Sequence, residues 1–282
     1  MRAYVILMIR SLINFQIYKF YKWRLNHINE KYNEDDLDTS AIVFSPHFDD
    51  ETLGCGGTIL KKKMAKADIK LVFMTDGSKS HSNLISEEKL KKIRKNEALA
   101  ASCLLGLDSQ DIYFLKFEDT KLIEHEGSAI ETIKEILLAQ EPHEIFIPYF
   151  KEPSLWNEDH IATNRIVIKA LKILGMKVII YEYPIWFWYH WPWVNTIKKS
   201  LKEWVYFLKF NPVYGFYFLR YLRCSVYIGD IMEQKRTVLN QYKSQMTRLI
   251  PDTRWETLPN FSNGKFLECF FQDHEIFRRH IL

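Results

Sequence analysis

The 282-residue sequence has few cysteines, and no two of them lie close together. Its four cysteines form no C-x-x-C motif, which argues against a disulfide framework and against a thiolate zinc site. Isolated reduced thiols fit this spacing better. No small-residue cleavage site follows the short apolar stretch at the N-terminus, so a secretory signal is a poor fit. We therefore expect a cytoplasmic protein.

Long uninterrupted apolar runs are also lacking. A spanning helix needs about 20 predominantly apolar residues. Arg10 splits the N-terminal run, and prolines interrupt a later, aromatic run at positions 184, 192 and 212. Neither segment is typical of a transmembrane helix.

Glycine is scarce, with 10 residues in the chain. Gly54, Gly56 and Gly57 do not complete a G-x-G-x-x-G motif because Ile59 follows them, so the dinucleotide-binding fingerprint is absent. We expect a tight turn at these glycines instead. The sequence has no internal repeat and no flexible Gly/Ser linker, which favours one domain with an appended or inserted subdomain.

Positive charge and aromatic side chains are concentrated in two segments. The formal net charge is +4, but residues 1–24 carry +5 and residues 183–221 carry another +4, which leaves −5 for the rest. Residues 183–221 also hold sixteen of the 42 aromatic residues. Because the remaining chain is acidic and has no zinc-finger or RNA-binding motif, nucleic acid is a poor candidate partner.

Residues 41–182 alternate short apolar runs with helical periods, which is typical of β-α-β units around a parallel sheet. This pattern predicts strands at Ala41–Ser45, Ile69–Thr75, Asp111–Leu115, Glu144–Pro148 and Lys177–Tyr181. It predicts helices at Leu53–Lys66, Glu87–Leu105, Ala129–Gln140, His160–Leu174 and, after the aromatic segment, Asp230–Leu249. We expect an N-terminal segment (1–40), an α/β core (41–182), an aromatic, basic and helical insertion (183–229), and a C-terminal helix and tail (230–282).

The residues that carry chemistry follow the predicted strands, where ligands bind in open parallel sheets. The strongest cluster, His-Phe-Asp-Asp-Glu at 47–51, follows the first strand. Clustered carboxylates repel one another unless a cation or proton intervenes, and imidazole with carboxylate suits zinc, iron or a similar ion. His47 and Asp50 can both face such an ion, which leaves Asp49 free to act on water. His160 is the best-placed third ligand, and a fourth position then stays open, as in catalytic zinc sites.

Each of these residues has a structural alternative. The acidic run can cap a helix, and a lone histidine is more often structural than a ligand. Arg94 can bind sugar hydroxyls or a phosphate, or it can pair with Glu97 on the same helix. Asp76 and Asp119 can orient a histidine or cap a helix.

The segment Ser45–Gly57 closely resembles the Pro-His-Pro-Asp-Asp-Glu signature of the PIG-L/LmbE-like N-acetylglucosaminyl deacetylases. Further motifs agree in family order: Thr75-Asp76-Gly77, Arg94-x-x-Glu97, Leu105-Gly106, Asp159-His160, Tyr181-Glu182-Tyr183 and Tyr242-x-Ser244-Gln245. The resemblance spans residues 40–182 and 230–250. It implies a Rossmann-like, mostly parallel sheet flanked by helices.

The resemblance also implies zinc on His47, Asp50 and His160, with Asp49 as general base. Phe48 replaces the usual proline without removing a ligand. Asn157 stands where many members carry a histidine that is thought to stabilise the oxyanion. An amide can still donate a hydrogen bond there, but it cannot carry charge.

The function implied is the zinc-dependent hydrolysis of an N-acetyl group on an N-acetylglucosamine-type sugar, either lipid-linked or a small glycoside. Two alternatives stay open: a metal-dependent phosphoesterase, and a noncatalytic member that binds sugar or metal. Because Trp and Tyr near Lys are typical of proteins at lipid head groups, we hypothesise that residues 183–221 and 1–24 contact the inner face of a membrane. Core packing, sugar stacking and an oligomer interface are the alternatives for the aromatic residues.

Overall fold

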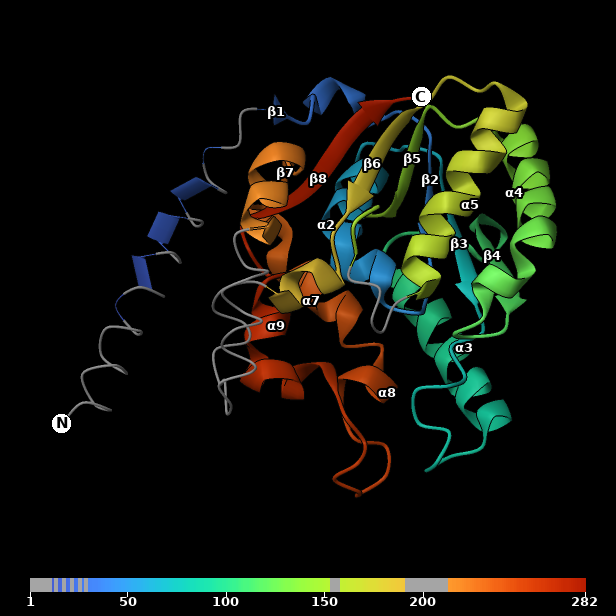
Figure 1. Ribbon diagram of the computed structural model, residues 1–282, viewed down its shortest axis with the longest axis vertical. Helices are drawn as coiled ribbons and strands as arrows, with labels where there is room; N and C mark the ends of the chain where they lie inside the picture. The colour runs from blue at the N-terminus through green and yellow to red at the C-terminus, as the bar shows by residue number, and fades with distance from the viewer. Residues whose placement is uncertain are drawn as a thin grey trace.

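The structure, a computed structural model, describes residues 30–152, 158–190 and 213–282, together with isolated residues between positions 12 and 27. In these ranges the strands form one eight-stranded sheet in the order β1-β7-β8-β6-β5-β2-β3-β4, with helices on both faces (Figure 1). The expected α/β fold with a central, mostly parallel sheet is confirmed.

Five neighbouring strands of the sheet are parallel, and their order reverses between β2 and β5. They are β2 (Ala41–Ser45), β3 (Ile69–Thr75), β4 (Ile112–Phe117), β5 (Glu144–Pro148) and β6 (Ile179–Tyr183). The connecting helices are α2 (Asp50–Met64), α3 (Glu87–Leu104), α4 (Glu126–Gln140) and α5 (Glu158–Leu174). The reversal is a topological switch point, where the loops after two neighbouring strands diverge and leave a crevice for a ligand.

Three further strands extend this sheet beyond β6. β8 (His274–Ile281) pairs antiparallel with both β6 and β7 (Cys224–Tyr227), and β1 (Glu30–Lys31) pairs parallel with β7. The sequence pattern predicted no strand in these places. Parts of the N-terminal, aromatic and C-terminal segments thus join the same sheet as the core.

Each face of the sheet packs against its own set of helices. α4 and α5 cover one face, where their apolar side chains meet those of β2, β3, β5 and β6. α2, α3 and α7 (Met232–Leu239) lie on the other face, against a larger core that includes many aromatic side chains. All five residues of β2 are buried, which explains its continuous apolar sequence.

Two local predictions are wrong. The expected helix Asp230–Leu249 is two helices, α7 and α8 (Lys243–Met246). The helix is interrupted before α8, where two contacts hold the chain in another conformation. The Tyr242 hydroxyl donates to Glu51 at 2.6 Å, and the Ser244 amide donates to Glu97 at 2.8 Å. The glycines at 54, 56 and 57 lie inside α2 and not in a tight turn.

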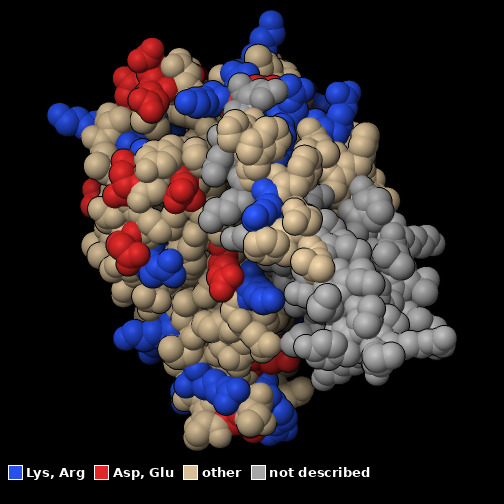
Figure 2. Space-filling view, turned by 90° about the vertical axis from the view of Figure 1, so that its left-hand side faces the viewer, with Lys and Arg blue, Asp and Glu red and all other residues tan. Residues whose placement is uncertain are grey.

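A short helix, α9 (Lys265–Glu268), packs close to the first part of the aromatic segment. Trp186 stacks on Phe266 with ring centroids 5.1 Å apart, and residues 213–221 are helical. Residues 191–212 lie outside the described residues, so most of the hypothesised membrane-contact segment does too. No helix in the described part of the chain is long and apolar enough to cross a membrane. Figure 2 shows acidic and basic side chains interspersed over the described part of the face that carries β1 and β7.

Candidate active site

The turn after β2 sets the positions of the His-Phe-Asp-Asp-Glu side chains. Asp49 has a φ of 114°, a left-handed conformation that is costly for a residue with a Cβ. The Glu51 carboxylate accepts the Asp49 amide at 3.2 Å, and the Asp49 carbonyl accepts the Leu53 amide at 2.8 Å. The helix then begins at Asp50, so α2 starts immediately after this strained residue.

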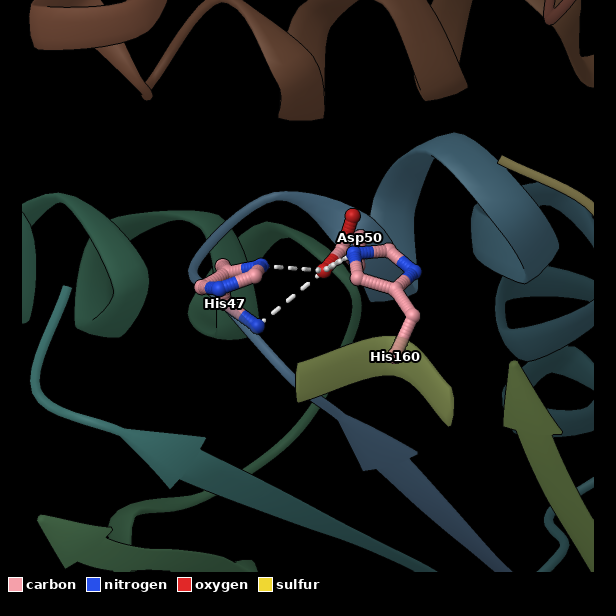
Figure 3. Close-up of side chains that lie close together, drawn as sticks. All are labelled: His47, Asp50 and His160. Atoms are coloured by element: carbon pink, nitrogen blue, oxygen red, sulfur yellow. Dashed lines mark hydrogen bonds and ion pairs between the residues drawn. The ribbon is translucent and has the colours of Figure 1, made fainter. Parts of the chain in front are cut away.

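The three predicted metal ligands lie side by side (Figure 3). The Asp50 Oδ2 atom is 3.2 Å from His47 Nδ1 and 3.1 Å from His160 Nε2, and one ligand atom from each residue lies within 4.8 Å of the others. His160 is fully buried, and apart from the 3.1 Å approach of Nε2 to Asp50 its ring nitrogens have no polar partner. Buried polar groups are rarely left unpaired, so this donor set fits a divalent cation with an open coordination position.

Two carboxylates behind His47 orient its ring. The Nε2 atom is 3.2 Å from Asp159 Oδ2 and 3.4 Å from Asp119 Oδ1. Backbone amides fix both acids: Asp159 accepts those of Thr120 (2.7 Å) and Leu122 (3.1 Å), and Asp119 accepts that of Lys79 (2.8 Å). A carboxylate behind a metal-binding imidazole holds the ring and its tautomer. Asp119 therefore takes the first of its two predicted roles, and the sequence pattern did not single out Asp159 as a site residue.

The pKa values of His47 and Asp50 are shifted because several acids surround the His47 imidazole. Burial lowers the pKa of His47, but its contacts with Asp119, Asp159 and Asp50 outweigh burial, so the pKa is raised well above the usual value. Burial raises the pKa of Asp50, but its contacts with His160 and His47 lower it overall. A protonated imidazole cannot be a ligand, so metal binding at His47 would displace its proton.

Asp49 lies beside the proposed ligands and also lines the cavity. Burial, followed by the charges of Asp50 and Glu51, raises the pKa of this carboxyl well above its ordinary value. A cation bound at Asp50 would offset the part of this pKa rise that comes from the negative charges. The Gln245 side-chain amide donates to Asp49 Oδ2 and to the Phe48 carbonyl. The sequence identified Gln245 only as part of a family motif and gave it no role.

The cavity above the site measures about 340 Å³. Its lining includes His47, Asp49, Asp50, Lys79, Ser80, His81, Arg94, Asp119, Thr120, Trp186, Gln245, Glu256, Leu258 and Phe261. Acidic, basic and aromatic groups thus converge on one space, as expected of a small-molecule site.

Arg94 forms part of the cavity wall. Its Nη1 atom donates to the Gly77 carbonyl at 2.7 Å and its Nη2 atom to Ser80 Oγ at 2.8 Å, while its buried Nε has no partner. No ion pair joins Arg94 to Glu97 in the described structure, because Glu97 accepts the amide and hydroxyl of Ser244 instead. The guanidinium therefore has an unused donor next to the site.

Asp76, which the sequence prediction also considered, does not line the active-site cavity. Asp76 pairs with Lys91 at 2.9 Å and accepts the Ser78 amide at 3.2 Å. These contacts stabilise the loop after β3, so this acid neither orients a histidine nor caps a helix. Asn157, the predicted oxyanion donor, falls in residues 153–157 and lies outside the described residues.

Comparison with known proteins identifies the chain's relatives. Residues 42–171 match the family described as PIG-L: GlcNAc-PI de-N-acetylase. The chain is 25% identical over 234 residues to the diacetylchitobiose deacetylase of Thermococcus kodakarensis, covering 82% of this chain and 78% of that protein. The solved N,N'-diacetylchitobiose deacetylase of Pyrococcus horikoshii, complexed with its inhibitor MPG, superposes with a TM-score of 0.62 at 22% identity and covers 88% of this chain and 87% of that chain.

The same fold also occurs in an enzyme with another reaction. GalB, the 4-carboxy-2-hydroxymuconate hydratase of Pseudomonas putida, superposes with a TM-score of 0.55 at 15% identity, covering 86% of this chain and 96% of that chain. The fold alone therefore does not define the chemistry. The family match is more specific, because it begins in β2, ends in α5 and includes the turn at 47–51 and His160. Over residues 42–171, the chain is similar to the PIG-L family of de-N-acetylases.

Proposed function

We propose that this protein is a metal-dependent amide hydrolase that removes the acetyl group from an N-acetylglucosamine-type sugar. The observation that carries the proposal is the buried His160, whose ring nitrogens have no polar partner besides Asp50 and which lies next to His47. Asp49 lines the same cavity as His47 and Asp50, which is where a hydrolase needs a general base. The named activities of the related deacetylases support the same reaction.

Zinc is the metal we propose for the site. Two imidazoles and one carboxylate with an open position form a typical catalytic zinc donor set. When bound, such an ion lowers the pKa of its water and polarises the carbonyl oxygen of the substrate.

The side chains around the site would carry the proton and orient the substrate. Asp49 accepts the proton of the attacking water and returns it to the departing amine, so one carboxyl acts first as base and then as acid. Gln245 holds the Asp49 carboxylate in place. Arg94 lines the cavity and binds a sugar hydroxyl or phosphate oxygen through its guanidinium group, and Asn157 donates a hydrogen bond to the oxyanion.

The phosphoesterase alternative would require a second metal. A second group, His47 with Asp119 and Asp159, has the required spacing. It shares His47 with the first group, however, and backbone amides already occupy both carboxylates. We therefore favour one metal and amide hydrolysis.

We further propose that the natural substrate is lipid-linked and that the protein contacts the cytoplasmic face of a membrane to reach it. Val213, Phe216 and Leu219 lie three residues apart on a helical segment and are 41%, 58% and 40% exposed. Flotation with anionic vesicles at low salt tests this contact. We expect the protein to float and the triple variant V213S/F216S/L219S to float less; a wild-type protein that stays in the soluble fraction would exclude the contact.

Acetate release tests the proposed reaction. Purified protein should release acetate from at least one member of a panel of N-acetylglucosamine derivatives, and Asp49→Asn should abolish release while the bound metal is retained. Metal retention matters because it separates loss of the base from loss of the site. No acetate across a broad panel would favour the noncatalytic alternative, and phosphate release would favour the phosphoesterase.

A further inference from the structure

A second groove lies beside the active site, between α3 and the end of β4. It measures about 420 Å³ and is lined by Phe48, Thr75, Asp76, Glu88, Lys91, Lys92, Lys95, Phe114 and Lys116. It shares no lining residue with the active-site cavity. Phe48 nevertheless lies between His47 and Asp49 in the chain, so one wall of the groove belongs to the active-site turn.

The groove has more positive charge than its own acids neutralise. The lining has four lysines and two acids. Lys91 forms ion pairs with both acids, at 2.9 Å from Asp76 and 3.5 Å from Glu88. Lys92, Lys95 and Lys116 have no carboxylate within ion-pair distance in the described structure, and all three are exposed. The Lys95 ammonium lies 5.2 Å from the centre of the Phe114 ring. Three cations without a counter-charge therefore surround one hollow.

The backbone at Lys116 favours a different residue. Lys116 has a φ of 60°, and the pairing of β3 with β4 shifts register between Phe73 and Thr75, next to this residue. Such a bulge with a left-handed residue normally takes glycine, because a Cβ is unfavourable there. A lysine at this position keeps a cation at the groove at the expense of backbone energy.

We propose that this groove binds a phosphate-type anion. Lysine ammonium groups are compact point charges that bind phosphate oxygens well, and three of them match the charge of a phosphate better than that of a single carboxylate. The proposal does not depend on the deacetylation reaction. The phosphate can come from the substrate itself or from a separate small anion, and the experiment below separates the two.

Isothermal titration calorimetry with inorganic phosphate at low salt tests the groove directly. The probe is added to wild type, to K92Q/K95Q, and to K89Q/K172Q, which removes two exposed lysines outside the groove. We expect K92Q/K95Q to weaken binding at least fivefold per lysine, since one unit charge at 4 Å in water contributes about that factor. The control variant should bind like wild type. Equal affinity in all three proteins, which phosphate bound at the metal would give, overturns the proposal.

Lys116→Gly separates binding from a structural role. Glycine relieves the left-handed conformation, so we expect a higher unfolding temperature together with weaker phosphate binding. β4 is an edge strand, and lysines there can also serve to block aggregation. A variant that aggregates but binds phosphate like wild type would support that role and reject the anion site.

Comparing the binding of two sugars shows whether the phosphate belongs to the substrate or to a separate anion. With the Asp49→Asn protein, N-acetylglucosamine 1-phosphate and N-acetylglucosamine are compared in wild-type and K92Q/K95Q backgrounds. If the anion belongs to the substrate, the sugar phosphate binds more tightly and loses that advantage in K92Q/K95Q. If it is a separate anion, the two sugars bind alike, and inorganic phosphate still binds in the lysine-dependent way.

Discussion

The orientation of two histidine rings determines whether the site can hold a metal. His160 is buried and its Nδ1 atom has no polar partner, whereas His47 is contacted on both edges. The Nδ1 edge of His47 faces Asp50 because Asp159 and Asp119 contact its Nε2 edge. These acids therefore position the ring.

Asp159→Asn tests this positioning. The amide keeps the size of the carboxylate but removes the negative charge behind His47, so we expect metal affinity to fall about 10- to 100-fold. Competition with a chelator of known affinity measures the change. The matched control is the exposed neighbour Glu158→Gln, which should bind metal like wild type. Equal affinities in both variants would contradict the proposed role of Asp159.

Glu152 gives a second prediction, about pH. Its carboxyl is buried and accepts the amides of Ile185 (2.6 Å) and Phe187 (2.8 Å), which flank Trp186 in the cavity wall. Burial, with the charge of Asp50, raises its pKa to about 8 despite these amide donors. The folded state thus keeps a proton that the unfolded state loses near pH 4.5. Its contribution to stability is complete below that pH and is lost as the pH rises through 8.

Glu152→Gln removes this titration. Between pH 5 and 8 we expect the free energy of unfolding of wild type to fall by a few kcal/mol relative to the variant, whatever the absolute stability of the variant. Urea titrations at several pH values measure the difference. Parallel pH profiles for the two proteins would show that Glu152 is ionised in the fold.

Local sequence predicted the site residues that stand in a recognisable local pattern. His47, Asp49 and Asp50 form one short motif after a clear strand, and His160 opens a helix after another. Asp159 and Gln245 received no role, because their contacts with His47 and Asp49 cross 112 and 196 positions. Only the folded chain shows such pairs.

Among the helices, α2 begins at the site residue Asp50 and packs closely against the sheet. Its glycines allow close packing: a Cβ on Gly54 would overlap the Tyr183 ring, and one on Gly57 would lie 2.6 Å from Ile228. The helix is kinked at Cys55, and Glu275 on β8 accepts the amides of Gly57 and Thr58 at 2.7 and 2.8 Å. β8 therefore caps the second half of the helix that begins with Asp50.

A pair of glycine substitutions tests this packing. Gly54→Ala should destabilise the protein by roughly 1 to 3 kcal/mol, because the Tyr183 ring must move. Gly127→Ala in α4 is the control, since nothing lies within 4 Å of its added Cβ, and alanine there should be neutral or stabilise slightly. Chemical denaturation measures both. A neutral Gly54→Ala would mean that α2 and β6 pack more loosely than described.

Helices and strands were predictable where a clear apolar pattern runs along the whole element. β2, β3 and β5 have the predicted bounds, because buried parallel strands read as continuous apolar runs. The break between α7 and α8 was not predicted, since it depends on Glu51 and Glu97 far away in the chain. β1, with two residues, and β7, with four, are too short to give a pattern.

For the whole molecule, the topology explains why one site receives residues from distant segments. β2 and β5 are neighbours at the switch point, so the turn at 47–51 meets the start of α5 there. α8 brings Gln245 from the C-terminal segment to the same place. The aromatic segment also reaches this place, because Trp186 lines the cavity.

We propose that His47, Asp50 and His160 hold one metal that the hydrolysis requires. The most direct measurement is the rate of acetate release from an active N-acetylated sugar during zinc titration of chelator-treated protein. We predict no release without metal, a linear rise that ends at one equivalent per chain, and no recovery in His160→Ala. Full activity in metal-free protein, or full recovery in His160→Ala, would contradict the account.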